Sequence, residues 1–161
     1  FGVPAAIGAK IAKRDKDVVL VTGDGGFQMN IQEMATAVTQ GTNITICLLN
    51  NYYLGMVRQM QELFYGKRYS ATCLRKRPGC PNDCKGPNEA CPKYTPDFVK
   101  LAESYGAYGI RVENEADIDA AFAEAKKHKD APTIIEFMIA TDQLVLPMVK
   151  SWNPMSEMIL K

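Results

Sequence analysis

Apolar side chains recur every three or four positions in five stretches of the chain, and this spacing predicts α-helices. In the second stretch Ile31, Met34 and Val38 share one face, and Gly41 is placed to end the helix. Pro96 stands at the start of the fourth stretch, where its missing N–H costs nothing. The predicted helices are 4–13, 28–40, 56–64, 96–106 and 116–127.

Continuous apolar runs rich in β-branched residues separate several of these helices. The runs 18–21 and 44–49 are typical of strands that are covered on both faces. The ranges 107–112 and 133–139 predict two further strands. Strands that alternate with helices indicate an α/β fold, with a doubly wound, mainly parallel sheet and helices on both faces.

The region between residues 65 and 95 shows no hydrophobic period. We interpret 71–95 as an irregular insertion that carries cysteines, within a single domain spanning residues 1–161. The last twenty residues form an apolar tail around Pro147 and Pro154.

Composition and charge fit one ordinary globular domain. The chain has 161 residues, of which 47% are hydrophobic and 23% charged, and its formal net charge is +1. No overall basic field favours nucleic acid or an anionic membrane as a partner. The apolar runs are too short to span a bilayer. We therefore expect an intracellular protein. Because the chain opens with Phe1 rather than Met, we also expect it to be a fragment of a longer protein.

Four of the five cysteines crowd one segment with the spacing C-x6-C-x3-C-x6-C. Four thiolates could hold Zn²⁺ or an iron–sulfur cluster, which would order a segment that has no core of its own. Two disulfides and reduced thiols are the alternatives. The four residues are Cys73, Cys80, Cys84 and Cys91, whereas Cys47 lies in a predicted strand and fits a small core residue.

Two successive predicted strands end in polar or glycine-rich sequences, Gly23-Asp24-Gly25-Gly26 and Asn50-Asn51. Ligands of open α/β sheets bind beyond the carboxyl ends of the strands. Glycines let backbone N–H groups approach an anion, and the helix that follows adds its positive N-terminal end. Carboxylate and amide oxygens suit Mg²⁺. A diphosphate held through Mg²⁺ fits these parts, although each taken singly is also an ordinary turn.

The spacing of the two sequences resembles the cofactor motif of thiamine-diphosphate-dependent enzymes, since 24 residues separate Gly25 from Asn50. Other matching stretches resemble the acetolactate synthase branch of this family. Together the stretches cover nearly the whole chain apart from the cysteine-bearing segment, and they lie at 1–10, 23–33, 48–51, 54–57, 68–70, 96–98 and 146–149.

This resemblance implies roles for particular residues. Asp24 and the Asn51 side chain would bind Mg²⁺ together with the backbone carbonyl of Tyr53. The glycines of the turn would offer backbone N–H groups to the diphosphate. The implied cofactor-binding residues are Gly23, Asp24, Gly25, Gly26, Asn51, Tyr53, Leu54, Gly55 and Met56.

The resemblance also implies an activity: decarboxylation of pyruvate and ligation of the two-carbon unit to a second 2-keto acid, in branched-chain amino acid biosynthesis. Family members take an activating glutamate from a separate N-terminal domain of a neighbouring subunit, and this branch holds FAD in a central domain. We therefore expect no catalytic residue here, no activity of the isolated fragment, a cytoplasmic homodimer or larger assembly, and a small regulatory subunit as a further partner.

Alternatives and departures remain open at the level of sequence. Another thiamine-diphosphate-dependent decarboxylase or carboligase would share the same motif, and a cysteine-based metal-binding or electron-transfer module would use it only as turns. By the same resemblance, Met60 stands where the plant and yeast enzymes usually have a tryptophan that lines the substrate channel. In the tail, Trp152 could pack over the active-site mouth or on the domain surface, and we expect the second. We expect His128 to be exposed among lysines.

Overall fold

The computed structural model describes residues 1–81 and 84–160. The chain divides into two compact units, each made of two segments. The first unit comprises Phe1–Asn51 and Lys93–Ile139, and the second comprises Tyr52–Pro92 and Ala140–Lys161. The predicted insertion 71–95 therefore falls almost entirely in the second unit.

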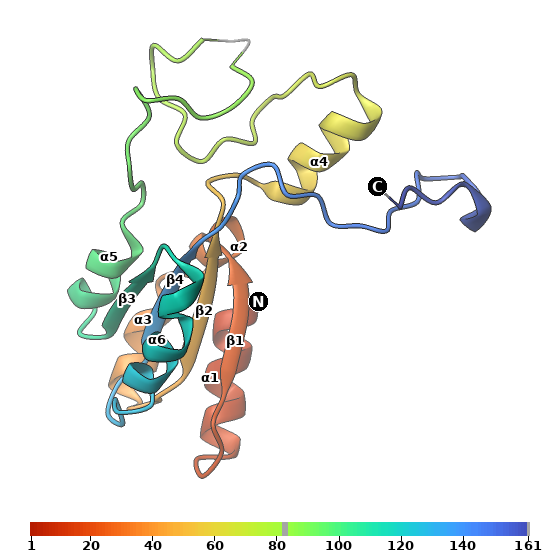
Figure 1. Cartoon of the computed structure of the whole chain (residues 1–161). Helices are drawn as coiled ribbons and strands as arrows, with labels where there is room; N and C mark the ends of the chain where they lie inside the picture. The colour runs from red at the N-terminus through yellow and green to blue at the C-terminus, as the bar shows by residue number, and fades with distance from the viewer. Residues whose placement is uncertain (82–83, 161) are drawn as a thin grey trace. The chain divides into compact units, whose positions relative to one another are not determined.

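The first unit is a four-stranded parallel sheet flanked by helices (Figure 1). The strands follow the order β1-β2-β4-β3, and each neighbouring pair is parallel. Their bounds are β1 Val19–Gly23, β2 Thr45–Asn50, β3 Tyr108–Val112 and β4 Thr133–Met138. The predicted α/β class and all four predicted strands are confirmed, with ends shifted by one or two residues.

One face of this sheet carries the larger core. The side chains of Phe27 and Phe98 are completely buried there and meet edge to face, with ring centroids 5.7 Å apart. Ile46 and Leu48 of β2 and Ile134 of β4 supply the strand side of the same core. The helices on this face are α1 (Gly2–Ala12), α2 (Asp24–Gln28), α3 (Glu33–Thr39) and α5 (Phe98–Ser104).

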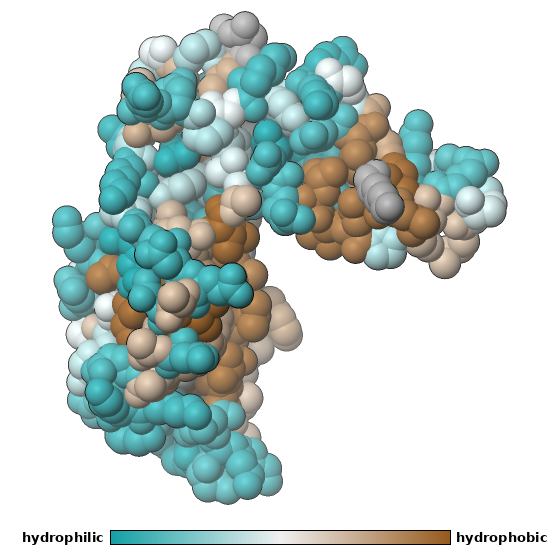
Figure 2. All heavy atoms as spheres, viewed as in Figure 1, coloured by the Kyte–Doolittle hydropathy of each residue, from teal (hydrophilic) through white to brown (hydrophobic). Residues whose placement is uncertain are grey.

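The opposite face is covered only in part. Helix α6 (Ile118–Ala125), preceded by the 3₁₀ turn η1 (Glu115–Asp117), packs on β3 and β4. Val19 and Val21 of β1 remain 54% and 65% exposed, and hydrophobic surface appears beside α6 in Figure 2. The prediction that 18–21 is covered on both faces is wrong, because β1 is an edge strand and no described helix of this unit covers its outer face.

The predicted helix 28–40 is also wrong in its bounds. Helix α2 begins at Asp24, directly after β1, and a turn over 29–32 separates it from α3. The N–H of Asn30 donates to the Phe27 carbonyl, and the N–H of Glu33 donates to the Asn30 carbonyl. The apolar spacing continues through this turn, so spacing alone could not reveal the break.

His128 is not exposed as predicted. Its ring stacks on Tyr108 with centroids 3.5 Å apart, and its Nδ1 lies 3.0 Å from the Thr133 hydroxyl. The chain turns back after α6 to enter β4, and this turn places His128 against the start of β3.

The second unit is built around α4 (Gly55–Phe64), as predicted, and contains the irregular segment. The buried amide of Gln59 donates to the Val145 carbonyl and accepts from the Val145 N–H, both at 2.8 Å. This pair fixes the C-terminal segment, with the 3₁₀ turn η2 (Met155–Glu157), to α4. Trp152 is fully exposed, so the expectation that it packs on the surface is wrong for this chain.

Hydrophobic surface gathers over α4 and the C-terminal segment (Figure 2). Met60, at the predicted channel position, lines a shallow groove there together with Val57 and Tyr65. In the described part of the chain, no helix is long and apolar enough to cross a membrane.

Candidate functional site

The side chains of Asp24 and Asn51 follow the carboxyl ends of two adjacent strands. Gly23 of β1 pairs with Leu49 of β2, Asp24 follows Gly23, and Asn51 is the first residue beyond β2. Both residues belong to the first unit, and helix α2 stands at the tip of β1 (Figure 1). The fold therefore brings the two predicted Mg²⁺ ligands to the same edge of the sheet, where α/β folds bind their ligands.

Asp24 is only 3% exposed. Its Oδ1 accepts a hydrogen bond of 2.9 Å from the N–H of Gly25. A buried carboxylate needs hydrogen bonds or a cation to offset its lost hydration. Its oxygen donors, with an amide oxygen of Asn51 at the same edge, are the hard ligands that Mg²⁺ prefers. The residues present fit a magnesium–diphosphate group at this edge.

The glycines after β1 adopt a conformation that the sequence did not indicate. Gly25 and Gly26 form the first turn of α2 instead of a loop. A Cβ on Gly26 would lie 3.4 Å from the Thr22 hydroxyl, at the limit of ordinary van der Waals contact. Because the Gly25 N–H already donates to Asp24, a diphosphate would compete with the carboxylate for it.

Asn50 has a structural role. It is completely buried, and its Nδ2 donates to Glu136 Oε1 at 2.6 Å. Glu136 Oε2 accepts from Arg111 Nε at 2.9 Å, and Arg111 Nη2 bridges to Asp97 Oδ1 at 2.7 Å. The hydrogen bond to Glu136 ties the Asn50 side chain to strand β4. This agrees with the assignment of Asn51, not Asn50, as the metal ligand.

The Glu136 network was missed by the sequence analysis. Its signal was an acidic residue in the middle of the apolar run 133–138. Burial raises the pKa of Glu136, and the hydrogen bonds from Asn50 and Arg111 offset this only in part. Burial also opposes ionisation of Asp97, but the bonds from Arg111 and from the Lys100 N–H outweigh it and hold the Asp97 pKa below its usual range.

The other predicted cofactor residues belong to the second unit. Tyr53 is buried, Leu54 and Gly55 are half-buried, and Met56 is 61% exposed at the start of α4. Burial, with Cys73 nearby, raises the pKa of Tyr53 to about 12. The guanidinium of the buried Arg58 lies 5.1 Å from the Tyr53 ring. The roles of these residues toward a cofactor, including the Tyr53 carbonyl as a magnesium ligand, stay predictions.

The cysteines are all free thiols. Cys47 is 5% exposed in β2, and burial raises the pKa of its thiol, as expected for a core residue. The other four are half-buried and border one cavity of the second unit. Among the described residues, no three Cys, His, Asp or Glu side chains are close enough together to hold one metal ion.

Comparison of the sequence with known protein families identifies the class to which this chain belongs. Residues 1–137 match the family "Thiamine pyrophosphate enzyme, C-terminal TPP binding domain". The chain belongs to this family, as its α/β sheet and the motif at its edge indicate.

Within the family, the chain is similar to acetolactate synthases. It is 41% identical to the acetolactate synthase large subunit of Corynebacterium glutamicum over 98% of this chain and 23% of that protein. It is 39% identical to the large subunit of Haemophilus influenzae, over 99% and 25%. It is 43% identical to the acetolactate synthase of Mycobacterium avium, over 92% and 22%. The chain thus spans about a quarter of the length of these relatives.

A solved structure shares the fold. The thiamine diphosphate-dependent 4-hydroxybenzoylformate decarboxylase of Rhodococcus jostii RHA1 superposes with a TM-score of 0.69 at 30% sequence identity. The match covers 88% of this chain and 23% of that chain.

Proposed function

We propose that this chain is the diphosphate-binding domain of an acetolactate synthase. The observation that carries the proposal is the identity of about 40% to acetolactate synthase large subunits, which extends over as much as 99% of the chain. It therefore includes residues of both units, among them the stretch after Asn51 that the family resemblance assigned to the acetolactate synthase branch.

In this proposal the side chains of Asp24 and Asn51 bind Mg²⁺, which neutralises the diphosphate of thiamine diphosphate. The cofactor supplies the thiazolium carbon that attacks a 2-keto acid. The chain's own contribution is to position this group rigidly. Burial of Asp24 fixes its carboxylate, and the bond between Asn50 and Glu136 fixes the end of β2 from which Asn51 projects.

The remaining parts of the proposal concern the whole protein. The substrates are two molecules of pyruvate, or pyruvate and 2-ketobutyrate. An activating glutamate and an FAD site come from domains other than this one, and the active unit is at least a homodimer, to which a small regulatory subunit is added.

The test is acetolactate formation from pyruvate by the full-length protein, with and without thiamine diphosphate and Mg²⁺. We expect product only when both are present. Asp24→Ala should remove Mg²⁺-dependent cofactor binding and leave the circular dichroism spectrum unchanged. Cys47→Ala, a change in the same sheet away from its ligand-binding edge, is the matched control and should keep full cofactor affinity. Full affinity in a folded Asp24→Ala protein would contradict the magnesium assignment.

A second candidate keeps the cofactor and changes the acceptor. The 30% sequence identity between this chain and a thiamine diphosphate-dependent decarboxylase supports this second candidate. Release of acetaldehyde from pyruvate without acetolactate would identify such a decarboxylase. The family match does not support the third alternative, a metal-binding or electron-transfer module built on the cysteines, in which the glycine and asparagine motifs are only turns.

A further inference from the structure

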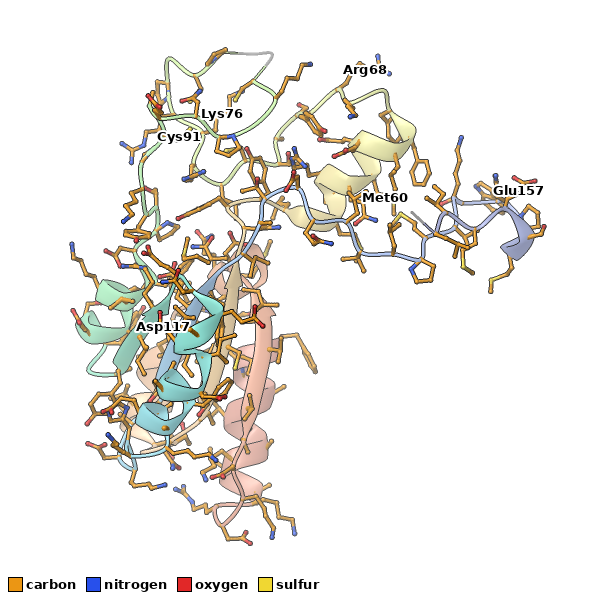
Figure 3. All side chains as sticks on the ribbon, in the orientation of Figure 1. Met60, Arg68, Lys76, Cys91, Asp117 and Glu157 are labelled. Carbon is orange, nitrogen blue, oxygen red and sulfur yellow. The ribbon has the colours of Figure 1, made fainter. Side chains whose placement is uncertain are left out.

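Four cysteines from one short segment border a single cavity in the second unit. The cavity has a volume of about 280 Å³. Figure 3 labels two of its lining residues, Lys76 and Cys91, both on the irregular segment. The cysteines of this cavity are Cys73, Cys80, Cys84 and Cys91, and none of them forms a disulfide. Nothing in the proposed thiamine diphosphate chemistry uses these thiols.

Local backbone structure holds this cysteine cavity in place. Cys73 forms an antiparallel bridge with Tyr53, flanked by hydrogen bonds of 2.9 Å between Leu54 and Thr72 and between Leu74 and Tyr52. One wall of the cavity is therefore tied to the chain that enters α4.

Several of the sulfurs already make local hydrogen bonds, and among them the thiol of Cys91 donates to Asn88 Oδ1 at 3.8 Å. The N–H of Arg77 donates to Cys80 Sγ at 3.4 Å, and the thiol of Cys84 donates to the Gly86 carbonyl at 3.1 Å. Backbone N–H donation to sulfur stabilises a thiolate and is one of the ways in which proteins tune iron–sulfur clusters. Cys80 and Cys91 are each followed by proline, which is also found after cluster-ligating cysteines.

Arg75 at the wall of the cavity indicates an anionic occupant. It is only 8% exposed, and its Nε has no hydrogen-bond partner among the described residues. Its Nη1 donates to the Pro92 carbonyl at 2.9 Å, and its guanidinium lies 3.6 Å from the Tyr52 ring centroid. A buried N–H of a cation without an acceptor is costly, and a negatively charged ligand in the cavity would satisfy it.

The charged residues that line the cavity also favour an anionic occupant. Lys76 and Lys85 line the cavity with Arg75, and its described lining contains no aspartate or glutamate. Among the described lining residues, an anionic group would therefore meet only basic charged neighbours.

The size of the cavity that the four cysteines line favours a cluster over a single ion. Four sulfurs around one Zn²⁺, at about 2.3 Å each, lie about 3.8 Å from one another. No three described side chains of the ligating types meet in this way. The four cysteines line a cavity of about 280 Å³, which is more room than one ion needs and enough for a core of several metal and sulfide atoms.

We propose that Cys73, Cys80, Cys84 and Cys91 bind an iron–sulfur cluster. Arg75 faces the net negative charge of the thiolate-ligated cluster. Binding is a ligand exchange without a change of oxidation state. A thiol-ligated carrier delivers the cluster: its four Fe–S bonds to the cluster and four S–H bonds of this chain break, four new S–Fe bonds form, and the released carrier thiolates take up the four protons. The cluster crosslinks the irregular segment, which the bridge between Cys73 and Tyr53 joins to the stretch that leads into α4.

The first experiment is elemental analysis of the full-length protein purified without oxygen. We expect equal amounts of iron and acid-labile sulfide, about four of each per chain, with visible absorbance that is bleached by dithionite. The same result is expected when the metal-free protein is reconstituted with ferrous iron and sulfide. Stoichiometric zinc without sulfide, or no metal after reconstitution, would overturn the proposal.

Variants locate the cluster. Cys84→Ser and Cys91→Ser should each lose more than half of the iron, and Cys47→Ala should keep all of it. Arg75→Gln, which keeps all four thiols, should shift the reduction potential of the cluster to a more negative value. Unchanged iron content in a folded Cys84→Ser protein would contradict the assignment, and if a cysteine variant does not fold, the iron and sulfide of the natural protein decide. Thiamine diphosphate binding, measured in parallel, tests the proposed function separately.

Discussion

Asn50 and Asn51 are adjacent in the sequence, but their side chains have different surroundings. Asn50 is completely buried and donates to the buried Glu136, whereas Asn51 is half-buried just beyond the strand. The pair of asparagines alone does not show which one faces a ligand, because that depends on the register between β2 and β4; only the family resemblance pointed to Asn51.

We therefore predict that alanine substitutions of the two asparagines affect different properties: stability for Asn50 and cofactor binding for Asn51. Asn50→Ala removes a donor from the buried Glu136 and should lower the free energy of unfolding by about 1–3 kcal/mol. Asn51→Ala should change that free energy by less than about 1 kcal/mol. It should weaken Mg²⁺-dependent cofactor binding by about tenfold or more. Chemical denaturation and a cofactor titration of the full-length protein measure both, and the reverse pattern would show that Asn50 is the ligand.

Asp97 links acid stability to the same network. Its pKa is held below the usual value, so ionised Asp97 stabilises the folded state above the ordinary carboxyl pKa of about 4, and this contribution is lost as the pH falls through its lower folded-state pKa. Glu136, whose pKa is raised by burial, has the opposite sign.

Asp97→Asn keeps a side-chain oxygen at the N-cap of α5 but removes the charge that faces Arg111. Above pH 5 we expect a loss of about 1–3 kcal/mol in unfolding free energy. Towards pH 3 the gap between variant and natural protein should narrow. Denaturation curves at several pH values test this, and a gap that stays constant would contradict the assigned role of the carboxylate.

At the scale of elements, the close packing of α5 on β3 depends on Gly109. A Cβ at this position would lie 2.8 Å from both the Cα and the carbonyl oxygen of Val99, which are backbone atoms that cannot rotate away. Apolar periodicity predicted both elements but not how closely they approach, because glycine contributes nothing to a hydrophobic pattern.

Gly109→Ala should therefore destabilise the protein by about 1–3 kcal/mol through overpacking. Gly8→Ala is the matched control, since Gly8 lies inside α1 with no atom within 4 Å of a new Cβ. That substitution should stabilise the protein by about 0.5–1 kcal/mol, because alanine favours the helix. Thermal unfolding of both variants compares them, and equal effects would refute the packing argument.

At the scale of the whole molecule, a ligand that binds only the folded protein raises its stability. With Mg²⁺, thiamine diphosphate at about 100 times its dissociation constant should add about 2.7 kcal/mol. Chelation with EDTA should remove most of this gain, because the diphosphate would lose the ion that neutralises it. Differential scanning fluorimetry of the full-length protein, with the Asp24→Ala variant as control, measures the change. A gain that persists in EDTA would argue against a magnesium-dependent site.

The sequence by itself determined the α/β class, the four strands and the family, because apolar periodicity and the spacing between Gly25 and Asn50 are properties of the chain alone. It also marked Asp24 and Asn51, which strand order then brought to one edge. Only the tertiary structure decided that one face of β1 is uncovered, that Asn50 binds Glu136, that a turn separates α2 from α3, and that four cysteines border one cavity. These features depend on contacts between residues far apart in the sequence, or on backbone geometry, and neither leaves a periodic trace in the amino-acid pattern.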